Sequence, residues 1–238
     1  MGAVVTAAHA RLDLFDGFEL RYDGTTVSLP MSAQRVVAFV ALQDHAVPRG
    51  YVACKLWLDS PEDHATSSLR SALWRLRQSG CDVIESAGRK LGLAPHVAVD
   101  AHEAADWARR MLDGRTEDSL HAPDGFVLGE LLPDWYEDWV LLERERLREL
   151  RVHALERLCE RLTETGSYAD AMETAQAVVK LEPLRESAHR LLIRVHLAEG
   201  NHSEAIRQFE LFRQLLKAEI GLEPSRQIHA LVSPLTGR

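Results

Sequence analysis

The stretch 65-ATSSLRSALWRLRQ-78 has two different faces when it is placed on a helix. Its apolar positions recur at i, i+3, i+4 and i+7, which is the spacing of a core-facing stripe: Leu69, Ala72, Leu73 and Leu76. At about 100° per residue the opposite face carries polar and bulky side chains: Ser67, Ser71, Trp74 and Gln78, flanked by Arg70 and Arg75. Arg77 lies nearer the apolar stripe. The pattern predicts a helix over residues 64–78 with a buried apolar side and a cationic outer side.

Three short runs near the start of the chain alternate polar and apolar residues, at 11–15, 18–22 and 25–29. Asp-Gly pairs separate them, at 16–17 and 23–24. Alternation interrupted by Asp-Gly is a strong local signal for antiparallel strands joined by tight turns. We therefore expect a small N-terminal sheet.

Two further helices are predicted between this sheet and residue 64. The first follows Pro30, has a broad apolar face over residues 36–42 and takes Ser32 as its N-cap. Residues 47–50, with a Pro and a Gly, should break it, and a second helix should cover residues 51–57. Residues 58–63 are interpreted as an acidic loop.

A hairpin is predicted after the third helix, with its tip at Gly88 and two cations, Arg89 and Lys90. Residues 97–99 can add a short strand. Strands, three helices and a hairpin, in this order, are typical of a winged helix with an N-terminal sheet. The third helix then suits a DNA major groove, and the cationic hairpin tip suits phosphates.

The second half of the chain is helical in pattern and contains a repeat of 34 residues. Gly166 and Gly200 are separated by this interval, as are Ala171 and Ala205. A period of 34, with Gly at the inter-helix turn and Ala at the tight helix contact, is the tetratricopeptide signature. The fold class expected is mainly α with a small β component: a winged helix-turn-helix domain followed by an all-α tetratricopeptide-like domain.

Charge is distributed unevenly along the 238 residues, whose net charge is -8. Residues 1–100 hold 10 Lys and Arg against 11 Asp and Glu, whereas residues 101–238 hold 18 against 25. Between residues 64 and 90 there are five cations and two carboxylates. A basic patch in the first half is compatible with nucleic acid even though the whole chain is acidic.

The sequence lacks the motifs of disulfide-rich, metal-binding and common catalytic or phosphate-binding sites. The three cysteines fit neither a disulfide framework nor a zinc spacing, and none of the 11 histidines stands in a close metal-binding pattern. No phosphate loop or nucleophile elbow is present. We expect no catalytic residues, no metal and no cofactor. Residues 1–10 lack the pattern of a secretory signal and no run is long enough to cross a membrane, so a cytoplasmic location is expected.

The sequence resembles the Streptomyces antibiotic regulatory protein family over residues 8–232. Five stretches carry the resemblance: 65–78 with Leu56-Trp57 before it, Gly129-Glu130-Leu131-Leu132-Pro133 with Trp139, Leu181-Glu182-Pro183-Leu184-Arg185-Glu186, and Glu219-Ile220-Gly221-Leu222-Glu223-Pro224. Their order and spacing are specific, although no single motif is. The resemblance implies an OmpR-like winged-helix DNA-binding domain over 8–100 and a bacterial transcriptional activator domain over 101–232.

The resemblance also implies partners. These are a direct-repeat DNA operator bound by a side-by-side pair of protomers, and RNA polymerase with its sigma factor, at promoters of secondary-metabolite genes. The loop before the recognition helix is the implied polymerase contact: Asp59, Glu62 and Asp63. The implied DNA contacts are on the third helix and the hairpin tip: Ser67, Arg70, Ser71, Trp74, Arg75, Arg77, Arg89 and Lys90.

Some alternatives stay open at this level. Trp74 can rest in the groove or close the core edge against the hairpin. Trp135 and Trp139 can line a ligand pocket, but packing between the first helices of the second domain is the preferred interpretation. Two other functions compete with the activator: a tetratricopeptide adaptor with weak or no DNA binding, and a ligand-responsive regulator, since helical-repeat surfaces commonly bind peptides.

Overall fold

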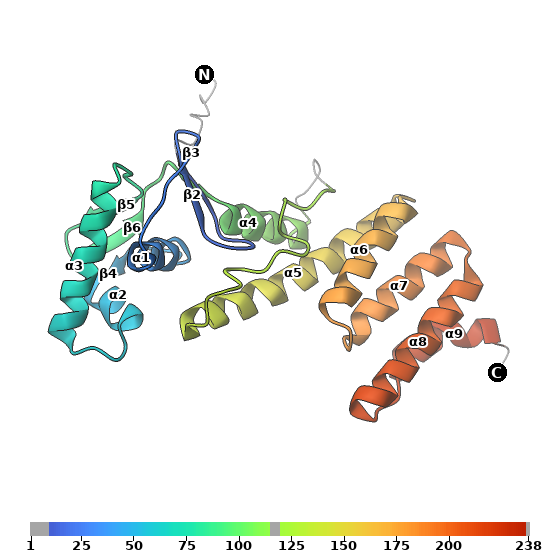
Figure 1. The fold of residues 1–238 in the computed structure, drawn as a ribbon. Coiled ribbons are helices and arrows are strands. Elements are labelled where there is room, and N and C mark those ends of the chain that lie inside the picture. The colour runs from blue at the N-terminus through green and yellow to red at the C-terminus, as the bar shows by residue number, and fades with distance from the viewer. Residues whose placement is uncertain (1–9, 115–119, 237–238) are drawn as a thin grey trace, which may run out of the picture. The chain divides into compact units, whose positions relative to one another are not determined.

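The computed structural model describes residues 10–114 and 120–236. Residues 1–9 lie outside this part; they include the first two residues of the predicted DNA-binding domain and nearly all of the stretch in which a secretory signal was sought. The chain divides into two compact units. The N-terminal unit comprises Met1–Ala104 and Gly129–Leu147, and the C-terminal unit comprises Ala105–Leu128 and Arg148–Arg238. The expected fold class is confirmed: helices dominate, and the strands are short and gathered in the first hundred residues (Figure 1).

The N-terminal sheet has the strand order β3-β2-β1-β7. Strand β1 (Ala10–Asp13) pairs antiparallel with β2 (Glu19–Tyr22), which pairs with β3 (Thr25–Thr26). On its other side β1 pairs in parallel with β7 (Val97–Val99). In β1, Ala10 and Leu12 are buried whereas Arg11 and Asp13 are half-buried, which is the alternation that the sequence predicted.

Three helices follow the first strands: α1 (Met31–Ala41), α2 (Arg49–Leu56) and α3 (Glu62–Gln78). Each begins directly after a proline, at Pro30, Pro48 and Pro61. The ring fixes φ near the helical value and removes an N–H group that would have no partner at a helix start. Proline, and not a serine side chain, therefore sets these boundaries. The prediction that Ser32 caps α1 was wrong.

Two predicted boundaries also shift. Val47–Pro48 forms a short strand, β4, and Gly50 lies in the first turn of α2, so the chain break is shorter than expected. Glu62 and Asp63 belong to the first turn of α3, which leaves only Asp59 of the three acidic residues in the loop. The carboxylates at this position favour the helix because they face the positive end of its dipole.

The hairpin consists of β5 (Ile84–Ala87) and β6 (Lys90–Leu93), and β6 also pairs with β4. Gly88 has a φ of 60°, and Gly at the first position of a two-residue turn is typical of tight hairpins. Gly92 lies against the α1–α2 connection, because a Cβ there would meet that of Ala46 at 3.3 Å. The predicted hairpin and its tip are confirmed.

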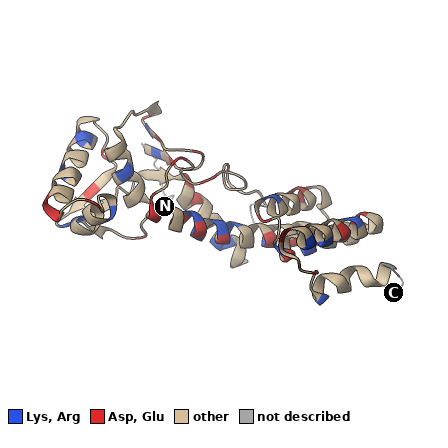
Figure 2. Ribbon diagram, turned by 60° about the horizontal axis from the view of Figure 1, so that its bottom comes forward, with Lys and Arg blue, Asp and Glu red and all other residues tan. Residues whose placement is uncertain are grey.

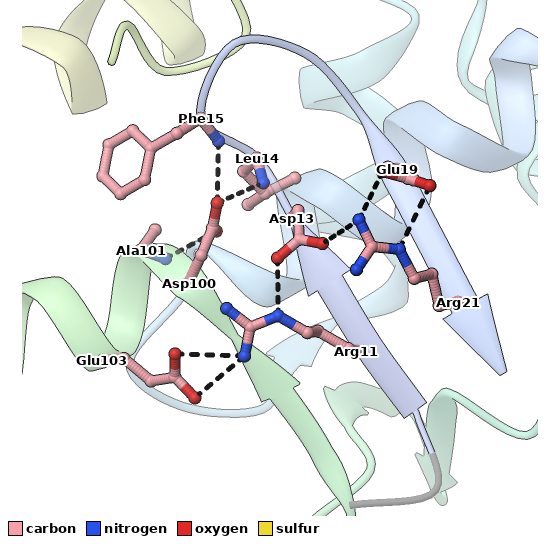
Figure 3. A network of polar contacts seen from close by, with 9 residues as sticks. All are labelled: Arg11, Asp13, Leu14, Phe15, Glu19, Arg21, Asp100, Ala101 and Glu103. Carbon is pink, nitrogen blue, oxygen red and sulfur yellow. Dashed lines mark hydrogen bonds and ion pairs between the residues drawn. The ribbon is translucent and has the colours of Figure 1, made fainter. Parts of the chain in front are cut away.

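A buried carboxylate joins the sheet to the next helix, α4 (Asp100–Leu112). Asp100 accepts hydrogen bonds from the backbone N–H groups of Leu14, Phe15 and Ala101, at 2.8, 2.9 and 2.6 Å (Figure 3). Burial raises the pKa of Asp100, and these N–H groups oppose the rise by stabilising the ionised form. Beside it, a chain of ion pairs runs from Glu103 to Arg11, Asp13, Arg21 and Glu19.

The segment Gly129–Leu147 packs within the N-terminal unit, although it lies beyond α4 in the sequence. Trp139 contacts Phe39 of α1 edge to face, with ring centroids 5.2 Å apart, and Trp135 stacks on Phe18 at 6.1 Å. The prediction that these two tryptophans pack between the first helices of the second domain was therefore wrong. They cover the apolar side of the winged helix instead.

The C-terminal unit is built from helical hairpins. It includes most of α5 (Asp138–Glu164), then α6 (Tyr168–Leu181), α7 (Glu186–Glu199), α8 (His202–Ile220) and α9 (Arg226–Thr236). Gly166 and Gly200 both have positive φ, at 77° and 86°, and end α5 and α7 in equivalent ways. Ala171 and Ala205 are fully buried at the helix contacts. The predicted 34-residue repeat thus corresponds to two equivalent inter-helix turns, each followed by a buried alanine.

Within residues 10–114 and 120–236, none of the helices combines the length and hydrophobicity that crossing a bilayer requires.

Candidate nucleic-acid interface

The two faces predicted for residues 64–78 are present in α3. Leu69, Ala72, Leu73 and Leu76 are buried in the helical core of the N-terminal unit. Every outward residue proposed as a DNA contact is exposed: Ser67, Arg70, Ser71, Trp74, Arg75 and Arg77. Arg77 therefore belongs to the outer side, in spite of its place near the stripe on the helical projection.

Trp74 is 60% exposed, although it is the largest side chain on this helix. Tryptophan is enriched at contact surfaces relative to the rest of a protein's surface. The exposure also decides between the two placements considered from the sequence, because Trp74 does not close the core edge. It stands on the same surface as the arginines.

The arginines of α3 have weak local partners. Arg75 lies 3.3 Å from the Ser32 hydroxyl and Arg70 lies 3.4 Å from the Ser67 hydroxyl, both at the long end for a hydrogen bond. Arg77 has no side-chain partner in the part of the chain that the structure describes. Since no carboxylate neutralises them, these guanidinium groups remain available to an external anion.

The serines differ from each other in availability. Ser71 donates its hydroxyl proton to the Ser67 carbonyl at 3.0 Å, a bond back along the helix. The Ser71 hydroxyl oxygen can still accept a hydrogen bond. To donate to a phosphate, however, the hydroxyl must first give up its bond to the Ser67 carbonyl. Ser67 keeps its own hydroxyl proton free for such a contact.

The hairpin tip presents Arg89 and Lys90, both exposed. Among the described residues neither side chain has a hydrogen-bond or ion-pair partner. The start of α2 supports the tip, because the backbone N–H of Arg49 donates to the Arg89 carbonyl at 2.9 Å. The Arg49 side chain then reaches Ser86 on β5, also at 2.9 Å. Arg49 is a third cation beside the hairpin that sequence reasoning missed, because only the β4–β6 pairing brings it there.

Charge changes sign along α3. Its first turn carries Glu62 and Asp63 and its last turn carries Arg75 and Arg77, an order that also suits the helix dipole (Figure 2). The dipole explains the sign at each end. It does not explain Arg70 or the exposed Trp74 in the middle of the helix.

Beside the α2–α3 loop, the N-terminal unit has a hollow of about 600 Å³. Asp59 lines it together with several apolar residues that are unusually exposed, of which Leu58, Tyr136 and Leu142 are 68, 77 and 71% exposed. Glu62 and Asp63, in the first turn of α3 directly after the loop, are also exposed. Around Asp59 the surface thus combines acid with exposed apolar side chains.

No set of three or more His, Cys, Asp or Glu side chains in the described stretches is arranged to hold a metal ion.

Comparison with known proteins places this arrangement in a family. Residues 81–235, more than half of the chain, match the family model described as "Bacterial transcriptional activator domain". The chain is 28% identical over 214 residues to the regulatory protein AfsR of Streptomyces coelicolor, covering 85% of this chain and 22% of that protein. It is 27% identical over 229 residues to AfsR of Streptomyces griseus, covering 90% of this chain and 23% of that one. It thus spans less than a quarter of the length of these relatives.

A solved structure shares the fold. It is that of Mycobacterium tuberculosis EmbR in complex with a low affinity phosphopeptide, with a TM-score of 0.75 and 20% sequence identity. The match covers 96% of this chain and 65% of the EmbR chain, so it includes both the winged helix and the helical repeats. The chain belongs to the bacterial transcriptional activator domain family, and its resemblance to the Streptomyces antibiotic regulatory proteins is confirmed.

Proposed function

We propose that the protein is a sequence-specific transcriptional activator that binds double-stranded DNA through α3 and the β5–β6 hairpin. One observation carries the proposal: five exposed cations on these two elements have no carboxylate partner among the described residues. They are Arg70, Arg75, Arg77, Arg89 and Lys90. In this proposal residues 8–100 form the DNA-binding domain and residues 101–232 the activator domain. Acting on DNA would place the protein in the cytoplasm, at the nucleoid.

The elements have different tasks in this proposal. Helix α3 enters the major groove, where an arginine can pair with a guanine edge through two hydrogen bonds. Trp74 packs against thymine methyl groups or sugars, and Ser67 and Ser71 approach the backbone. Arg89 and Lys90 contact phosphates, which raises affinity and salt dependence and adds little specificity.

The relatives support the regulatory part of the proposal, since both curated proteins are named as regulatory proteins. By the family resemblance, two protomers bind side by side on a direct repeat and recruit RNA polymerase, for genes of secondary metabolism. Asp59, Glu62 and Asp63 are the proposed contact to the polymerase and its sigma factor. The hollow beside Asp59 supports this assignment, because its lining combines apolar with charged residues, as protein contact surfaces do.

A binding measurement with the chain's own upstream DNA tests the proposal. Labelled duplex from that region should raise the fluorescence anisotropy at lower protein concentration than a shuffled duplex of equal length. Affinity should fall steeply with salt because phosphate contacts release counterions. Equal binding to both duplexes, or no retention on heparin, would favour the protein-interaction adaptor instead. Mapping the bound sites by crosslinking and sequencing would then identify the operator and the regulated genes.

A further inference from the structure

The C-terminal unit contains a hollow of its own, with a volume of about 600 Å³. It lies between α5, α6 and residues 120–128. Leu155, Leu158 and Leu162 of α5 form one buried apolar side. Val127 and Ala177 add to this apolar lining. The hollow is partly open to solvent.

One face of α6 supplies the rim. Asp170, Glu173, Ala177 and Lys180 line the hollow at i, i+3, i+7 and i+10, which places them along one side of the helix. The two carboxylates lie towards the start of α6 and the ammonium group lies near its end. Among the described residues, none of these three charged side chains has an ion-pair or hydrogen-bond partner. Other charged side chains of the unit are paired, as Arg148 is with Glu182.

The combination has the features of a small-molecule site. Such sites are concave, have volumes of about 300–1,000 Å³ and are mostly apolar with a few polar groups that orient the ligand. Two unpaired carboxylates at one end favour a cation there, and charge complementarity selects between ligands of equal apolar size. A bound protein would instead bury about 800 Å² on each partner, which calls for a broader surface than one hollow.

We propose that this hollow binds a small amphipathic amine. The apolar body of the ligand lies against the α5 leucines, and its protonated amine lies beside Asp170 and Glu173. Lys180 at the other end takes a hydrogen-bond acceptor of the ligand. The site is distinct from the DNA-binding surface and adds a ligand input to the activator domain.

Three naphthalene probes of similar size and different charge test the proposal on the full chain. They are 2-(1-naphthyl)ethylamine, the corresponding neutral alcohol and the anion of 1-naphthaleneacetic acid (called the acetate below). Binding is followed by calorimetry in the absence of DNA. The amine should bind about tenfold more tightly than the acetate, because two partly screened carboxylates attract one ligand and repel the other. The alcohol should lie between them. Equal affinities for the three probes, or no binding by any, would overturn the proposal.

Variants then locate the site. Asp170→Asn combined with Glu173→Gln should reduce the preference for the amine to less than about threefold, while binding of the alcohol stays unchanged. Both side chains are exposed, so the fold should tolerate the change. Glu219→Gln is the matched control, since Glu219 is exposed on α8 outside the hollow. Ala177→Trp should fill the hollow and abolish binding of all three probes. Undiminished binding to this variant would place the probes elsewhere and contradict the proposal.

The readout keeps this proposal separate from the activator function. A protein that binds the amine but no DNA would refute only the activator. A protein that binds DNA but none of the probes would refute only the ligand site.

Discussion

The arginines of α3 and those of the C-terminal helices carry the same charge but have different surroundings. In the C-terminal unit Arg185 lies between Glu149 and Glu156, at 3.4 and 3.3 Å. Arg148 pairs with Glu149 and Glu182, which ties α5 to the end of α6. On α3 and the hairpin, Arg75 has only a distant serine, and Arg89 has no described side-chain partner.

The difference separates two uses of one residue type. A guanidinium group with two carboxylate neighbours has its hydrogen bonds satisfied within the protein, and its loss leaves like charges facing each other. A guanidinium group facing solvent adds little to stability and can meet a phosphate or a guanine edge without first breaking an ion pair. Net charge alone, at -8, hides this division.

Replacing an arginine of α3 should have the largest effect. Arg75→Ala should weaken operator binding by about 1–3 kcal/mol if the side chain reads a base, and the free energy of unfolding should barely change. Fluorescence anisotropy and urea unfolding measure the two quantities. Arg194→Ala is the matched control, because Arg194 is exposed on α7 without a described partner. Unchanged operator affinity in Arg75→Ala would remove this residue from the interface.

The opposite outcome is expected for a paired arginine. Arg185→Ala should lower the free energy of unfolding by about 1–2 kcal/mol, since Glu149 and Glu156 lose their shared partner. DNA affinity should remain unchanged. Arg207→Ala, which removes an exposed pair within α8, should cost less than about 0.5 kcal/mol. If both variants were equally stable in urea, the contrast between the two groups of arginines would be lost.

A buried histidine makes the C-terminal unit sensitive to acid. His189 stacks on Phe212 with ring centroids 4.1 Å apart, and its two nitrogens face the Pro183 carbonyl and the Gln208 amide. Burial lowers its pKa below the ordinary value of 6.5. The unfolded chain therefore takes up a proton first as the pH falls, so stability is complete above pH 6.5 and declines below it.

This pH dependence can be measured by calorimetry between pH 7.5 and 5. The melting temperature of the C-terminal unit should fall on acidification. His189→Gln should melt at a lower temperature throughout but with a smaller decrease across this interval. His202→Gln, at an exposed position, should keep the wild-type decrease. A parallel decrease in all three proteins would assign the effect to other groups.

The smallest expected effect concerns the thiols. Cys54 of α2 is exposed, whereas Cys159 of α5 is fully buried and donates to the Ala171 carbonyl at 3.2 Å. Burial raises the pKa of Cys159 to about 12. Ellman's reagent at pH 8 should label Cys54 rapidly and Cys159 only after unfolding, because the thiolate is the reactive form. Cys54→Ser should remove the rapid phase, and a rapid phase that remains would contradict this assignment.

Local periodicity explains how much of the fold was predictable. The stripe of α3 and its opposite arginines follow from a repeat of 3.6 residues, and the helical hairpins follow from a repeat of 34. The N-cap of α1 was misassigned to Ser32 because both a serine and a proline are signals for a helix start, and Pro30 lies only two residues earlier. Pro30, Pro48 and Pro61 together are the signal that would have corrected it.

Long-range pairing explains what the sequence left out. Neither the parallel contact of β1 with β7 nor the place of Trp135 and Trp139 produces a local pattern. For the same reason Arg49 was missed beside the hairpin, since strand pairing and not sequence distance brings it to Ser86. The exposed residues of α3 were predictable because one helix contains them all.

The return of Gly129–Leu147 to the N-terminal unit has a consequence for biosynthesis. Leu131 forms a bridge with Phe15, more than a hundred positions earlier, and Trp139 covers Phe39. When only the first 100 residues have emerged from the ribosome, Phe15, Phe18 and Phe39 therefore lack these contacts, even though all the winged-helix segments are outside. The unit can be completed only when the residues up to Leu147, and with them the start of α5, have emerged.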